Sequence, residues 1–129
     1  MMKKRILLID DEENFTKLVK FNLEGTGRYE VRTENTGSRG LAVAKEFKPD
    51  LVLLDVMMPE IDGGEVCYQL DSDEETNDIP VVFLTAAVDK QEVENSSGVI
   101  GGRSFIAKPV SLEKLVEFIE KNIRGSVSE

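Results

Sequence analysis

The segment Leu51-Val52-Leu53-Leu54-Asp55 is the most informative about the fold, because four apolar residues in a row end at a carboxylate. Runs of the same kind occur on either side along the chain, at residues 6–9 and 81–84. An uninterrupted apolar strand is typical of a parallel sheet that is buried on both faces. The three runs therefore predict the central strands of such a sheet.

Two further segments predict edge strands. Residues 29–33 alternate between apolar and polar side chains, and residues 104–107 end at a Lys-Pro pair. Between the strands lie helical patterns, with apolar stripes at Phe15, Leu18, Val19 and Leu23 and at Leu112, Leu115, Val116, Ile119 and Ile123. The order strand–helix, repeated five times, predicts an α/β fold with a five-stranded parallel sheet covered by five helices.

Residues that cap helices support this order. Asp62 with Glu65, and Asp89 with Glu92, have the spacing of a capping box at the start of two helices. Ser111 is suited to the N-cap position of the last helix.

The second and fourth helices are bounded by residues that break helices. Residues 38–47 supply the second, which Pro49 ends. Gly98, Gly101 and Gly102 crowd the end of the fourth, so we expect that helix to be short.

The composition indicates one globular domain. The chain has 129 residues, of which 40% are hydrophobic and 32% charged. We assign residues 4–124 to the domain and residues 125–129 to a tail or truncated linker. No apolar run is long enough for a membrane span or a signal peptide, and the single Cys67 excludes an intramolecular disulfide. We expect a cytoplasmic protein.

The absence of histidine excludes Ser-His-Asp triads, Cys-His pairs and histidine zinc sites. Carboxylate, lysine and hydroxyl chemistry remains. The net charge of −9 would repel phosphate backbones, so we expect no direct binding of nucleic acid by this domain. A hard divalent cation is the more natural ligand for such a surface.

Polar side chains follow four of the predicted strands. Asp10 and Asp11 follow the first, Asp55 the third, Thr85 the fourth and Lys108 the fifth. Ligands of open parallel sheets bind beyond the carboxyl ends of the strands. Like charges a few ångströms apart repel by about 4 kcal/mol at an intermediate dielectric, and a Mg²⁺ ion bound by the carboxylates would offset that repulsion.

Each of these residues also has a purely structural interpretation. An Asp-Asp pair can cap a helix, an aspartate can lead into a turn, and a lysine can be a solvated cation. The acidic residues 71–78 resemble the start of a calcium loop, but Thr76 stands where the sharp turn needs glycine. We interpret that stretch as a solvated loop after the third helix.

The chain resembles the receiver domain of bacterial two-component response regulators over residues 5–123. The matching stretches are Ile6-Leu7-Leu8-Ile9-Asp10-Asp11-Glu12, Leu53-Leu54-Asp55-Val56-Met57-Met58-Pro59-Glu60-Ile61-Asp62-Gly63, Phe83-Leu84-Thr85-Ala86 and Phe105-Ile106-Ala107-Lys108-Pro109. The resemblance implies a flavodoxin-like three-layer sandwich with strand order 2-1-3-4-5.

The resemblance also implies a site. Asp55 would be the nucleophile that receives a phosphoryl group. Asp10 and Asp11 would bind Mg²⁺, for which Mn²⁺ can substitute, together with Asp55 and the backbone carbonyl of Met57. Lys108 would pair with the phosphoryl oxygens.

Further implied roles concern signalling. The Thr85 hydroxyl would bond a phosphoryl oxygen, and the Phe105 ring would swing inward on activation. Lys108-Pro109 matches a peptide bond that is usually cis. The competing interpretation of Phe105 is a core residue that is fixed in both states.

The resemblance implies a phosphoacceptor that catalyses its own phosphotransfer and dephosphorylation, and not a turnover enzyme. Its partners would be a sensor histidine kinase or phosphotransfer protein, an output domain or target protein of unknown kind, and a second copy on phosphorylation. A haloacid-dehalogenase-type phosphatase would need an acid at Met57, and a nucleotide-binding fold would need a glycine-rich loop after the first strand. A pseudo-receiver would lack one of the expected functional residues.

Overall fold

The computed structural model describes residues 3–85, 99–100, 103–108 and 111–123, with the backbone alone for residues 85, 99–100 and 103–104. The elements in chain order are β1 (Lys4–Ile9), α1 (Glu13–Gly25), β2 (Tyr29–Glu34), the 3₁₀ turn η1 (Gly37–Arg39), α2 (Gly40–Phe47), β3 (Leu51–Asp55), α3 (Gly63–Ser72), β4 (Val81–Thr85), β5 (Val99–Ile100), β6 (Arg103–Ala107) and α5 (Leu112–Asn122).

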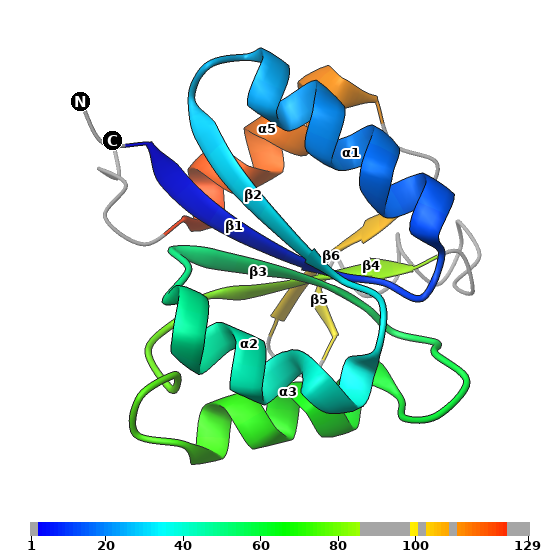
Figure 1. The fold of residues 1–129 in the computed structure, drawn as a ribbon, viewed down its shortest axis with the longest axis vertical. Helices are drawn as coiled ribbons and strands as arrows, with labels where there is room; N and C mark the ends of the chain where they lie inside the picture. The colour runs from blue at the N-terminus through cyan, green and yellow to red at the C-terminus, as the bar shows by residue number, and fades with distance from the viewer. Residues whose placement is uncertain (1–2, 86–98, 101–102, 109–110, 124–129) are drawn as a thin grey trace.

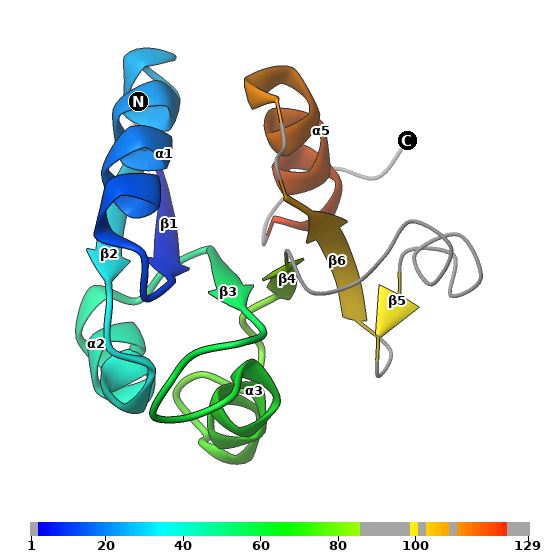
Figure 2. The ribbon, with the colours of Figure 1, turned by 90° about the vertical axis from the view of Figure 1, so that its right-hand side faces the viewer.

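The strands form one sheet in the order β2-β1-β3-β4-β6-β5. Figure 2 shows them side by side, from β2 at the left to β5 at the right. The pairs from β2 to β6 are all parallel, and β6 is the fifth predicted strand. The predicted order 2-1-3-4-5 is therefore confirmed. The predicted fourth helix, with Asp89 and Glu92 at its start, lies outside the described residues.

The short strand β5 differs from the prediction. Val99 and Ile100 pair antiparallel with Ser104 and Arg103 of β6, in a segment that we expected to end the fourth helix. Both residues are β-branched, and such side chains fit a pleated strand better than a helix. β5 thus adds a sixth strand beyond the parallel five.

Helices cover both faces of the sheet. In Figure 1, α1 and α5 lie above the sheet, while α2 and α3 lie below it. Alternate residues of a strand point to opposite faces of the sheet. β1 therefore supplies Ile6 and Leu8 to the core layer under α1 and α5, and Leu7 and Ile9 to the core layer under α2 and α3. All four side chains are fully buried, as expected for a central parallel strand.

The core face of α1 corrects the predicted stripe. Val19 and Leu23 are buried, but Leu18 is 59% exposed and Thr16 takes the core position in its place. Thr16 lies three residues before Val19 and therefore on the same helix face, whereas Leu18 is turned by about 100° from Val19. The Thr16 hydroxyl donates to the Glu13 carbonyl at 3.0 Å, which satisfies this buried polar group. Leu115 and Ile119 of α5 and its C-cap residue Ile123 are buried as predicted, and Leu112 is 37% exposed.

Two predicted caps are confirmed. The Asp62 side chain accepts a hydrogen bond from the Glu65 amide at 2.9 Å, and Ser111 Oγ accepts one from the Lys114 amide at 3.2 Å. α2 ends at Phe47, and its C-cap residue Lys48 has a left-handed φ of 53°, directly before Pro49. Within the described residues, no helix is long and apolar enough to cross a membrane.

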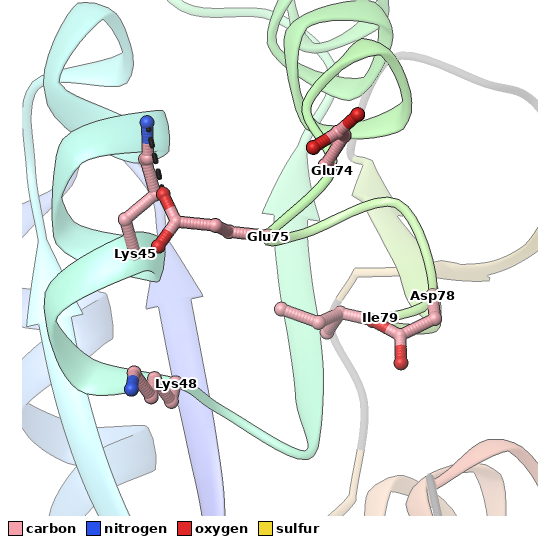
Figure 3. Close-up of a pocket in the computed structure, with 6 residues that line it drawn as sticks. All are labelled: Lys45, Lys48, Glu74, Glu75, Asp78 and Ile79. Carbon is pink, nitrogen blue, oxygen red and sulfur yellow. Dashed lines mark ion pairs between the residues drawn. The ribbon is translucent and has the colours of Figure 1, made fainter.

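The acidic residues 71–78 contain a structural lysine contact. Lys45 of α2 lies 3.1 Å from an oxygen of Asp73 and 3.2 Å from one of Glu75. Thr76 is buried and donates to the Leu70 carbonyl at 2.6 Å. A depression of about 310 Å³ opens here, shown in Figure 3 and lined by Lys45, Lys48, Glu74, Glu75, Asp78 and Ile79. It precedes β4 and so lies at the edge of the sheet away from the carboxyl ends of the strands.

Candidate functional site

Parallel pairing brings three chain segments to the same edge of the sheet. Ile9 is in register with Leu54, and Thr85 is in register with Ala107. The residues that follow β1 and β6, and the last residue of β3, therefore gather where the strands end. These residues are Asp10, Asp11, Lys108 and Asp55.

Three carboxylates form the centre of the site. Asp10, Asp11 and Asp55 each offer an oxygen, and these oxygens lie within 4.8 Å of one another. Asp10 has no exposed surface and Asp55 is 5% exposed, while Asp11 is half-buried. Three hard oxygen donors from separate carboxylates are the donor set that Mg²⁺ or a similar divalent cation prefers. The residues thus fit the predicted metal.

Lys108 neutralises part of this charge. Its ammonium nitrogen lies 2.5 Å from Oδ2 of Asp10, 3.7 Å from Oδ1 of Asp55 and 3.9 Å from Oε1 of Glu12. The lysine side chain is only 10% exposed, and its nitrogen lies 4.3 Å from the centroid of the Phe15 ring. The structure thus places the ammonium inside the carboxylate cluster.

Asp10 is fixed by contacts on both its side chain and its backbone. Its Oδ1 accepts a hydrogen bond from the Glu12 amide at 3.0 Å. Asp10 therefore binds the backbone just before α1, although the N-cap residue of that helix is Glu12. The Asp10 carbonyl accepts from Asn35 Nδ2 at 2.7 Å, and the same amide donates to Thr16 Oγ1 at 3.0 Å. Asn35 thereby ties β1, β2 and α1 together behind the site.

The segment after Asp55 is held by its backbone. The Val56 amide donates to the Leu84 carbonyl at 3.1 Å, and the Gly63 amide donates to the Val56 carbonyl at 2.7 Å. A Cβ at position 63 would lie 2.3 Å from the backbone oxygen of Asp55. Only glycine lets α3 begin this close to the backbone that carries the central carboxylate.

The environment shifts the acidity of Asp55. The pKa of Asp55 is raised from 3.8 to about 6, chiefly by burial and next by the negative charge of Asp10. The Lys108 ammonium lowers the pKa, and the neighbouring Asp11 raises it further. A carboxylate in such surroundings is destabilised until a cation compensates it, which agrees with the donor set described above.

Other predicted site residues have mixed outcomes. The Met57 side chain is 64% exposed, and the proposed role of its backbone carbonyl stays a prediction. The Thr85 hydroxyl and Pro109 lie outside the described part of the structure, as does the predicted cis bond. Phe105 is 2% exposed and packs in the core layer of α2 and α3, so its ring is already inward here and the predicted switch stays a prediction.

Sequence reasoning missed two residues of the site. Asn35 follows β2 with no motif to mark it, although a polar residue at the carboxyl end of a strand is a usable signal. Phe15 was assigned only to the apolar stripe of α1, and its ring also faces the Lys108 ammonium.

Comparison with known families gives one match that covers most of the chain. The family profile described as response regulator receiver domain matches residues 6–120. The DNA-binding dual master transcriptional regulator RpaA of Synechocystis is 38% identical over 121 residues, which are 93% of this chain and 49% of RpaA. The polar-differentiation response regulator DivK of Brucella anthropi is 36% identical over 92% of this chain and 95% of DivK. The chain thus spans about half the length of RpaA and nearly all of DivK.

Solved structures agree with the sequence relatives. The chemotaxis protein CheY4 of Vibrio cholerae superposes with a TM-score of 0.79 at 25% identity, over 93% of this chain and 98% of CheY4. The N-terminal domain of a response regulator receiver protein from Methanoculleus marisnigri gives a TM-score of 0.67 at 35% identity, over 91% and 94% of the two chains. On this evidence the chain belongs to the response regulator receiver domain family of two-component signalling.

Proposed function

We propose that Asp55 accepts a phosphoryl group from a phosphohistidine of a sensor kinase or phosphotransfer protein. The observation that carries the proposal is the gathering of three carboxylates and one ammonium around Asp55 at the carboxyl edge of the sheet. A carboxylate oxygen of Asp55 attacks phosphorus, the P–N bond to the donor breaks, and the imidazole leaves with the electron pair. The product is an aspartyl phosphate.

Asp10, Asp11 and Asp55 would hold Mg²⁺, with the Met57 carbonyl as a further ligand. When bound, the ion supplies positive charge to the oxygens of the phosphoryl group. Lys108 has the reach to stabilise the same oxygens, because its ammonium lies 3.7 Å from Asp55 and is shielded from water. The Thr85 hydroxyl would donate to one of them. Transfer of this kind depends on positioning and charge neutralisation more than on acid–base chemistry.

The chain's own residues do not favour a phosphatase that turns over. Such an enzyme needs a general acid two residues after the nucleophile, where this chain has Met57. We therefore infer a switch that carries the phosphoryl group for a limited time. We also infer a reducing compartment such as the cytoplasm, because the chain has a single cysteine, Cys67, and so forms no intramolecular disulfide.

The output of the switch is a separate proposal. We infer that the phosphorylated domain acts on an output domain, a target protein or a second copy of itself. Relatives of two lengths support this range, since RpaA is about twice as long as the match and DivK is matched over nearly its whole length.

A labelling experiment tests the acceptor. The protein is incubated with acetyl phosphate and Mg²⁺, and the mass of the intact chain is measured. We expect one added phosphoryl group in the wild type and none in Asp55→Asn. A matched control, Asp62→Asn, changes an aspartate that caps α3 and should leave labelling intact. Equal labelling of wild type and Asp55→Asn would place the acceptor elsewhere and refute the proposal.

A further inference from the structure

The Phe15 ring forms one wall of the space that holds the Lys108 ammonium. The ammonium nitrogen lies 4.3 Å from the ring centroid, within the range of a cation–π contact. Phe15 packs on the core layer between the sheet and the helices α1 and α5, so its ring has a support behind it. Lys108 has 10% of its side chain exposed, which removes most of the water that would weaken the attraction.

This contact differs from the other cation–ring contacts of the described residues. Those pair Arg5 with Phe47 and Arg28 with Tyr29 at 5.6 Å, and Lys121 with Phe118 at 6.0 Å. The Phe15 contact is shorter by more than 1 Å, and its cation is the one inside the carboxylate cluster. Those other contacts involve none of the three clustered carboxylates.

A lysine at this position needs a restraint. Its four-carbon stem is flexible, and three acceptors compete for the ammonium: Asp10 at 2.5 Å, Asp55 at 3.7 Å and Glu12 at 3.9 Å. A ring face attracts the cation without forming a strong hydrogen bond, so the N–H groups stay available for oxygen acceptors. The ring can therefore hold the nitrogen in place while it changes partner from Asp10 to an oxygen bound at Asp55.

We propose that Phe15 is a positioning residue for Lys108 in the phosphorylation of Asp55. This inference rests on the proposed function. Phe15 itself would touch neither the phosphoryl group nor the metal. It acts by keeping the ammonium at the distance from which Lys108 can reach the transferred oxygens.

Kinetics with acetyl phosphate and Mg²⁺ test the proposal. Phe15→Leu keeps an apolar side chain but removes the ring face, and we expect labelling of Asp55 to slow by about threefold to tenfold, as loss of a contact of this strength implies. Phe15→Tyr keeps the ring and should label within about twofold of the wild type. Phe118→Leu is the matched control, because Phe118 packs on the same core layer but contacts Lys121. It should leave the labelling rate unchanged.

Fluorinated phenylalanines at position 15 separate the ring face from packing. Added fluorine atoms withdraw electrons from the face while the ring keeps nearly its size, so the rate should fall stepwise with each fluorine. NMR of labelled lysine gives an independent signal, since the ring current should shift the Lys108 methylene protons and Phe15→Leu should abolish that shift. This series stays informative if Phe15→Leu folds poorly.

The outcomes distinguish the two proposals. A wild-type protein that takes no phosphoryl group would refute the proposed function, whatever the variants do. A labelled wild type with an unchanged rate across the fluorinated series would overturn the role of Phe15 alone. The same conclusion would follow if Phe118→Leu slowed labelling as much as Phe15→Leu.

Discussion

The ammonium nitrogen of Lys108 lies 2.5 Å from Oδ2 of Asp10, a carboxylate with no exposed surface. The lysine thus compensates a buried negative charge. Removing one partner of a buried ion pair leaves the other charge uncompensated, which costs much more than the pair itself contributes. Lys108 therefore has a structural task in addition to its proposed catalytic one.

Replacement of Lys108 should reveal its contribution to the stability of the fold. In the presence of a chelator, Lys108→Met should lower the free energy of unfolding by about 3 kcal/mol, measured by urea denaturation. Lys17→Met is the control, because Lys17 is exposed on α1 and should change stability by less than about 0.5 kcal/mol. If the two variants lose equal stability, Lys108 does not compensate Asp10.

Mg²⁺ should stabilise the folded protein by relieving repulsion among the three carboxylates. At a hundred times the dissociation constant, the gain in the free energy of unfolding is about 2.7 kcal/mol. Asp11→Asn removes one half-buried carboxylate of the proposed metal site and should lose most of this gain in thermal melts with and without Mg²⁺. An undiminished Mg²⁺ shift in the double variant Asp10→Asn/Asp11→Asn would place the metal elsewhere.

The acidity of Asp55 predicts a pH dependence of stability in the protein without metal. Its pKa is about 6 in the folded protein against 3.8 as the ordinary value, so the folded state binds the proton more tightly. The associated stability is fully present below pH 3.8 and is lost as the pH rises through 6, by about 3 kcal/mol in total.

Asp55→Asn has no carboxyl group to titrate and should escape this loss. With a chelator present, its stability relative to wild type should rise between pH 4 and pH 7, as measured by urea denaturation across that range. A constant difference between the two proteins over the same range would show that Asp55 has an ordinary pKa.

Replacement of glycine by alanine should have opposite effects on stability at two positions. Gly63→Ala would put a Cβ 2.3 Å from the Asp55 carbonyl oxygen, so we expect a loss of at least about 2 kcal/mol and slower labelling of Asp55. Gly25→Ala at the end of α1 meets nothing within 4 Å and should stabilise by about 0.4–1 kcal/mol. Similar effects at both positions would contradict the close packing at Gly63.

The central strands and the site edge were predictable because each carries a local signal. Apolar runs such as residues 51–54 have few alternatives to a buried strand, and the polar residues that follow them must share an edge once the strands are parallel. The same pattern could not predict which residue of α1 faces the core, since Thr16 replaces Leu18 through the packing of a hydrogen-bonded hydroxyl. The spacing of residues in the sequence likewise does not predict which of three carboxylates lies nearest to the Lys108 ammonium, because that depends on distances in the folded structure.

Contacts between residues that are far apart along the chain could not be predicted from the sequence either. Asn35 bonds to Asp10, and Phe15 faces Lys108 across 93 residues of sequence. Neither contact has a motif, because each depends on how β2 and α1 pack behind the strand ends. β5 was not predicted, because two β-branched residues among glycines are too short a segment to indicate a strand where a helix is expected.

Asp10 and Lys108 are separated by 98 residues, and this separation has a consequence for protein synthesis. Asp55 leaves the ribosome well before Lys108 does, because 53 residues separate the two (108 − 55), and at 5–20 residues per second these take about 3–10 s to make. During that interval the sheet lacks β6, so a growing chain carries Asp55 without the Lys108 ammonium that lies beside it in the folded protein. On the function proposed for Asp55, the nascent chain should therefore accept a phosphoryl group only after nearly all of the domain has been translated.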